Sequence, residues 1–129
     1  MATAPVFAVT PRVSAVSIAT ADSGMTAPTT YGSLITGAST GTRISEIVCK
    51  IAVTSTSTVS VVRVFLYDGT NTTLFDEIAL PAATAGSGVV STRVSSSYSN
   101  LILPSAAWSI RVSTSVAQAT HVTALGADL

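Results

Sequence analysis

Charged side chains are scarce in this sequence of 129 residues: six are basic, six are acidic, and the formal net charge is zero. They make up 9% of the chain, against roughly 25% in ordinary soluble domains. Six scattered cations cannot neutralise many phosphates, so we expect no nucleic-acid partner. A surface without net charge also provides little repulsion between copies of the protein.

Cysteine and histidine occur once each, as Cys49 and His121. One cysteine cannot form a disulfide within the chain, and these two residues alone cannot build a zinc site of the Cys/His type. Apolar runs reach only four or five residues, as in residues 64–67, whereas a bilayer span needs about 20. The N-terminus also lacks the cationic start and apolar stretch of a secretory signal. We therefore expect no metal, no cofactor and no membrane partner.

Residues that favour β-strands are abundant. Apolar residues make up 47% of the chain, and serine and threonine together number 39. Apolar and polar residues alternate with period two almost throughout, which is typical of strands and not of helices. Strands are expected at 13–20, 31–36, 44–54, 59–67, 74–80, 89–96, 98–103, 107–114 and 120–125, although 89–103 could form one bent strand. About eight or nine short strands predict an all-β protein, an antiparallel β-sandwich of the jelly-roll-like kind.

The domain organisation predicted from this pattern is a single β-sandwich over residues 13–129, preceded by an extended N-terminal arm of residues 1–12. The arm carries the apolar residues Val6, Phe7 and Val9. We predict that these three residues bind a neighbouring molecule.

The strand at residues 61–68 has two apolar faces. A strand of a sandwich needs only one. Arg63, Phe65 and Tyr67 share the second face because side chains alternate along a strand. Either a loop of the same chain or another subunit must cover that face, and the sequence leaves both open. We add these three residues to the predicted partner-binding set.

Candidate catalytic groups are few. Asp76 and Glu77 are neighbours on a strand, so they point to opposite faces and cannot form a facing acid/base pair. An ion pair from Arg63 to one of them is expected. His121 is expected to be a hydrogen-bonded strand histidine, since the sequence has no G-x-S-x-G nucleophile elbow. Cys49 lies on an apolar face and is expected to be buried and unreactive. We predict that the protein is not an enzyme.

The sequence contains a hairpin at residues 62–82, the Leu103–Pro104 turn, the segment 108–114 and a small-residue tail at 124–128. Together these stretches resemble small β-sandwich proteins encoded among the structural genes of tailed bacteriophages. The resemblance covers roughly residues 42–129 and includes no catalytic residue. Similar proteins have paired glycines in the tail, whereas this sequence has Ala127 after its one glycine there.

The resemblance implies a virion component: a capsid decoration (cement) protein, or a head or tail fibre subunit. Few charges are available to block strand edges, which promote association, so we expect a homo-oligomer. The predicted state is a homotrimer that binds the major capsid protein or another virion protein. It is expected to be assembled in the cytoplasm of a bacterial host and to be located in the virion. The alternatives are a tail, collar or fibre subunit, and a carbohydrate or host-surface binding module that uses Tyr31, Tyr67 or Tyr98.

Overall fold

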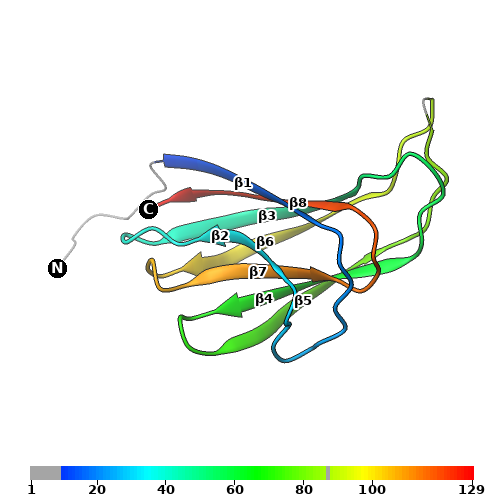
Figure 1. The fold of residues 1–129 in the computed structure, drawn as a ribbon. Helices are drawn as coiled ribbons and strands as arrows, with labels where there is room; N and C mark the ends of the chain where they lie inside the picture. Colours follow the sequence, from blue (N-terminus) through cyan, green and yellow to red (C-terminus); the bar gives the residue numbers. More distant parts are fainter. Residues whose placement is uncertain (1–9, 87) are drawn as a thin grey trace.

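The computed structural model describes residues 10–86 and 88–129, which form two four-stranded sheets packed face to face (Figure 1). The strands are β1 (Thr10–Ile18), β2 (Gly32–Thr36), β3 (Thr42–Ile51), β4 (Ser60–Tyr67), β5 (Thr72–Leu80), β6 (Arg93–Leu103), β7 (Ser109–Thr114) and β8 (Thr120–Asp128). One sheet has the order β1-β8-β3-β6 and the other β2-β7-β4-β5, with every neighbouring pair antiparallel. This is the strand order of a jelly roll, so the predicted fold class is confirmed.

Strand β6 is one long strand, as in the alternative in which residues 89–103 form one bent strand and not two separate ones. Its pairing with β3 shifts near the middle: Ile44 lies opposite Leu101, but Glu46 lies opposite Ser97. The extra residues on β6 produce a bulge, which bends a strand without ending it. Residues 89–92, predicted as strand, belong to the loop before β6.

Strand β1 begins three residues earlier than the sequence predicted. Thr10, Pro11 and Arg12 pair with the end of β8, so they belong to the sheet and not to the N-terminal arm. A proline is tolerated here because β1 is an edge strand, where one side of the backbone needs no ladder partner. Residues 1–9, which include Val6, Phe7 and Val9, lie outside the described residues.

The hydrophobic core fills the space between the two sheets. On β3, Cys49 is buried together with Ile47 and Ile51, and Val53 packs against the same cluster, as the sequence predicted. Buried side chains alternate with outward-facing ones along the strands. The whole cluster is Ile18, Leu34, Ile35, Ile44, Ile47, Cys49, Ile51, Val62, Val64, Ile78, Leu80, Leu101, Leu103, Ile110, Val112, Val122 and Ala124.

Side chains join the two sheets along both open sides of the sandwich. On the β1–β2 side, Ser14 Oγ donates a hydrogen bond to the Leu34 carbonyl (2.6 Å). On the β5–β6 side, Tyr98 Oη donates to the Asp76 carboxylate (2.7 Å). At these points the chain itself provides part of the edge protection that sheet proteins need.

A loop extension projects from one end of the sandwich (Figure 1). It consists of the β3–β4 loop (residues 52–59) and the β5–β6 loop (residues 81–92, of which residue 87 is not described), which lie side by side. The Ser57 amide donates to the Ala83 carbonyl (2.8 Å), and the Ala83 amide donates to Ser57 Oγ (2.9 Å). These two segments therefore hold each other in place away from the core.

Candidate functional site

The predicted contact residues Arg63, Phe65 and Tyr67 lie on the outer face of the sheet β2-β7-β4-β5. Phe65 is fully buried within a single chain and does not belong to the core between the sheets. The sequence left open whether the same chain or another subunit covers this face. Over Phe65, the same chain provides the cover. In register, Phe65 lies opposite Arg111 of β7. As the structure stands, Phe65 has no surface to offer a partner.

Arg111 is held between two tyrosine rings on this face. Its guanidinium carbon lies 3.6 Å from the ring centroid of Tyr67 and 4.3 Å from that of Tyr31. Tyr31 directly precedes β2 and Tyr67 ends β4, and β7 lies between these strands, so the rings approach from both sides. A cation over an aromatic face is stabilised by about 0.5–2 kcal/mol, depending on its desolvation. Tyr31, Arg63, Phe65, Tyr67, Glu77, Arg111 and Ser113 together are called the arginine–tyrosine patch below.

An ion pair forms the side of the arginine–tyrosine patch next to β5. Arg63 Nε lies 3.0 Å from Glu77 Oε1, which confirms the predicted pairing across the hairpin. Asp76 points the other way and accepts the hydrogen bond from Tyr98, which confirms that the two neighbouring acids face opposite sides. Glu77 thus forms its ion pair on the outer face, whereas Asp76 accepts its hydrogen bond between the sheets.

Three buried polar atoms of the arginine–tyrosine patch have no hydrogen-bond partner among the described residues. They are Arg63 Nη1, Arg111 Nε and Ser113 Oγ. Arg63 and Ser113 lie opposite each other in register, and Arg111 is two residues before Ser113 on the same strand. Side chains two apart on a strand share a face, so the three side chains lie on the same face at neighbouring positions of β4 and β7.

Burial controls the ionisation of two groups between the sheets. Burial raises the pKa of the Cys49 thiol to about 12, and the charge of Asp76 adds to the effect. Burial also raises the pKa of the Tyr98 phenol, which its hydrogen bond to Asp76 raises further. Since the thiolate is the reactive form, Cys49 is a packing residue at neutral pH.

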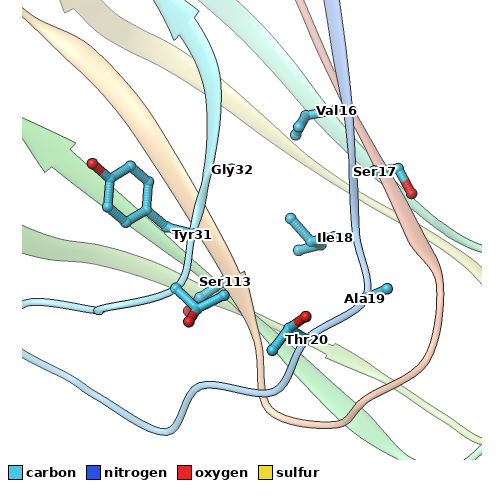
Figure 2. Close-up of a pocket in the computed structure, with 9 residues that line it drawn as sticks. Val16, Ser17, Ile18, Ala19, Thr20, Tyr31, Gly32 and Ser113 are labelled. Carbon is cyan, nitrogen blue, oxygen red and sulfur yellow. The ribbon is translucent and has the colours of Figure 1, made fainter.

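A cleft of about 230 Å³ opens between the ends of β1 and β2 (Figure 2). Val16 and Ile18 line it together with Gly32, where an added Cβ would lie 2.9 Å from each of them. The ring of Tyr31 points away from these residues, toward the outer face (Figure 2). The cleft therefore has small aliphatic and hydroxyl walls, and its one aromatic residue is engaged elsewhere.

The three tyrosines proposed as a sugar platform all have partners within the chain. Tyr31 and Tyr67 lie against Arg111. Tyr98 packs against Phe75, with ring centroids 5.5 Å apart, and donates its hydroxyl to Asp76. They are spread over two sites, so they do not form a single aromatic platform.

His121 lies on β8 and is exposed, with its side chain beside Ser17 and Thr123. Its side chain makes no hydrogen bond to any described residue, so the predicted hydrogen bond of this histidine stays a prediction. Within residues 10–86 and 88–129, no group of three or more His, Cys, Asp or Glu side chains is placed to hold a metal ion. No helix in the described part of the chain is long and apolar enough to cross a membrane.

The β1–β2 loop, which leads to Tyr31, is organised by the carboxylate of Asp22. It accepts hydrogen bonds from the amides of Gly24 (2.8 Å), Thr29 (2.9 Å) and Thr30 (2.8 Å), and from the Thr29 hydroxyl (3.0 Å). These bonds, the one from the Thr30 amide most of all, lower the pKa of Asp22 below its ordinary value of 3.8. The charged form of Asp22 therefore holds the loop.

We expect the variant Asp22→Asn to be less stable than the wild type at neutral pH, because an amide group cannot accept all four bonds. A pKa lowered by folding stabilises the protein above the ordinary pKa, and the stabilisation is lost as pH falls through the lowered value. The difference in thermal midpoint should therefore shrink below about pH 4. Thermal denaturation monitored by circular dichroism from pH 7 to pH 2.5 measures this.

The matched control is Glu46→Gln, an acid-to-amide change on β3 at a side chain that accepts no hydrogen bond from the described residues. It should melt close to the wild type at neutral pH. Equal losses in the two variants, or an Asp22→Asn difference that does not change with pH, would contradict the role assigned to the Asp22 carboxylate.

Comparison with known proteins gives distant structural similarity. No protein-family model and no curated protein matches the chain. Among solved structures, the fold is similar to a chain from the structure of infectious bursal disease virus Gx strain, with 17% identity and a TM-score of 0.30. The match covers 93% of this chain and 33% of the virus chain, so this chain spans about a third of that chain's length. At this TM-score the similarity carries no argument about what the protein does.

Proposed function

We propose that this protein is a non-enzymatic structural component of a virus particle, a capsid decoration (cement) protein of a tailed bacteriophage. In this role it forms a homo-oligomer, a trimer, and bridges subunits of the major capsid protein. The jelly-roll strand order fits the proposal because jelly rolls are common in viral capsids, although lectins and cupins share the fold. Fold alone does not select a function, so the surface must carry the proposal.

The observation that carries the proposal is the loop extension. Neither of its two segments contains a charged residue. Val59, Val89 and Val90 on these segments are 64%, 59% and 83% exposed. Exposed apolar side chains on a projecting, uncharged element are typical of a surface that another molecule covers.

The outer face of the sheet β1-β8-β3-β6 provides a second contact surface in this proposal. Val13 on β1 and Ile102 on β6 are exposed, and serine, threonine and alanine are frequent between them. Short side chains lose little conformational entropy when a partner covers them. Residues 1–9, with Val6, Phe7 and Val9, remain the predicted anchor to a neighbour.

The test uses particles of the source virus from which this protein has been removed, to which the purified chain is added back. We expect the wild type to bind and the variant Val90→Asp to bind about tenfold more weakly or worse, since a carboxylate would be buried in an apolar contact. Met25→Asp is the control, because it places a carboxylate on an exposed apolar residue of the β1–β2 loop, outside both the loop extension and the outer face of the sheet β1-β8-β3-β6. Co-sedimentation measures binding.

Two results would overturn the proposal. One is absence of the protein from purified particles by mass spectrometry, and the other is equal binding by Val90→Asp and the wild type. Copy number separates the remaining alternatives. A number that matches the capsid subunits favours decoration, and a few copies per particle favour a tail, collar or fibre subunit.

A further inference from the structure

The buried side-chain polar atoms that lack a partner in the described structure all come from one place. Arg63 Nη1, Arg111 Nε and Ser113 Oγ belong to neighbouring positions on β4 and β7. Buried polar atoms are rarely left without a hydrogen bond, and an exception indicates a missing water or ion. Three exceptions on adjacent residues indicate one shared partner.

The chemistry of these atoms defines what the partner must offer. The two guanidinium nitrogens can only donate hydrogen bonds, and the serine hydroxyl can donate as well. The partner therefore has several acceptor atoms close together.

The charges of the arginine–tyrosine patch favour an anion over water. Arg63 is paired with Glu77 through Nε. Arg111 makes neither an ion pair nor a hydrogen bond with any described residue, so this area has an excess of one positive charge. Asp76, the other acid on β5, is hydrogen-bonded to Tyr98 and faces away. A desolvated cation without a counter-ion is unfavourable, and a bound anion would remove that cost.

The two tyrosines hold the Arg111 side chain in an orientation that suits an anionic ligand. They contact its guanidinium from both sides, at 3.6 and 4.3 Å, and fix its orientation. A guanidinium held by rings over its faces keeps the N–H groups of its edge free, and this planar fork matches the oxygens of a carboxylate or phosphate group. Little side-chain entropy remains to be lost when the anion binds.

We propose that the arginine–tyrosine patch is a binding site for a small oxyanion, a carboxylate or phosphate group. Arg111 Nε, Arg63 Nη1 and Ser113 Oγ supply the hydrogen bonds. Glu77 positions Arg63, and the tyrosines position Arg111. Anion binding here is independent of whether the protein belongs to a virus particle.

The test follows the Nε–Hε resonances of the arginines in ¹⁵N-labelled protein during titration with inorganic phosphate and, separately, with acetate, at constant ionic strength. We expect saturable shifts of the Arg63 and Arg111 signals and no saturable shift of the exposed Arg93. Shifts with phosphate alone assign the site to phosphate groups, and shifts with acetate alone assign it to carboxylates. Shifts with both support the shared oxyanion chemistry.

Two variants test the geometry. Arg111→Lys keeps the charge but loses the planar fork and Nε, so we expect its anion affinity, read from the Arg63 signal, to fall about tenfold. Ser113→Ala removes one donor without removing charge and should weaken binding by a smaller factor. Arg93→Lys is the matched control and should bind like the wild type.

The proposal is overturned if neither anion gives a saturable shift at Arg111. It is also overturned if Arg111→Lys and Ser113→Ala both bind as tightly as the wild type, because the anion then sits elsewhere. A fall of equal size in Arg93→Lys would mean that the loss is not specific to the arginine–tyrosine patch, which also overturns the proposal.

Discussion

Replacing Gly126 by alanine is expected to destabilise the protein severely. Gly126 lies in β8, between β1 and β3, and pairs with Arg12 on one side and Ile44 on the other. A Cβ at this position would overlap the carbonyl oxygen of Arg43 and lie 3.1 Å from the Ile44 Cα. These are backbone atoms of a central strand, which cannot move aside as the end of a flexible side chain can.

The pairing between β3 and β8 explains why the backbones come so close at Gly126. The register shifts between Ile44 and Glu46, so β3 carries a bulge there, directly opposite Gly126. A bulge bends its own strand and brings one residue out of the regular ladder. Only a residue without a side chain fits against the bulged segment.

We expect Gly126→Ala to lower the free energy of unfolding by about 3 kcal/mol or more, the upper range for a steric clash in a packed region. For a domain of this size that loss lowers the thermal midpoint by on the order of 10 °C. Urea denaturation followed by Trp108 fluorescence and calorimetry measure the two quantities. If the variant fails to fold, the result agrees with the expectation.

The matched control is Gly86→Ala in the loop extension, where no described atom lies within 4 Å of the added Cβ. Its stability should stay within about 0.5 kcal/mol of the wild type. If Gly126→Ala has the same thermal midpoint as the control, the β3 backbone can move aside at the bulge. The close approach would then not exclude a side chain at position 126.

The course of the strands could be predicted from the sequence because each strand carries its own signal. The run from Ile47 to Ile51 alternates buried and outward residues, and Asp68 with Gly69 marks the turn after β4. The sequence alone did not explain why a glycine stands at position 126. The structure supplies the reason, which is the approach of the β3 backbone.

The arginine–tyrosine patch could not be predicted in the same way. Alternation along β7 placed Arg111 with Ser109 and Ser113 on one face, but it does not say which strands lie beside β7. Tyr31 is 80 positions away from Arg111 in the sequence. The two meet only because β7 inserts between β2 and β4, and that order follows from the whole sheet.

The cover over the second face of β4 could not be predicted for the same reason. The sequence correctly placed Arg63, Phe65 and Tyr67 on a second, partly apolar face. It could not decide what covers that face, because Arg111, which lies opposite Phe65, and Tyr31 come to it from distant parts of the chain. A hydrophobic residue on the outer side of a sheet is thus compatible with a subunit contact or with burial by long side chains of the same chain.

The variant Phe65→Ala is expected to distinguish these two roles. Phe65 is 0% exposed within one chain, so truncating it removes buried apolar surface and leaves a cavity. We expect the free energy of unfolding to fall by about 3–5 kcal/mol, as for other buried aromatic residues. Urea denaturation at several protein concentrations measures this loss.

The matched control is Phe75→Ala on the neighbouring strand β5, where the residue is 42% exposed and its ring packs at a tilt against Tyr98. That change should cost only about 1 kcal/mol, mostly from the aromatic pair. If Phe65 acts within the chain, the difference between Phe65→Ala and the wild type will be the same at every protein concentration. Subunit association contributes to stability by mass action, so a role between copies would depend on protein concentration. A loss of stability that appears only at concentrations where the wild type forms oligomers would therefore place Phe65 in the contact surface between copies.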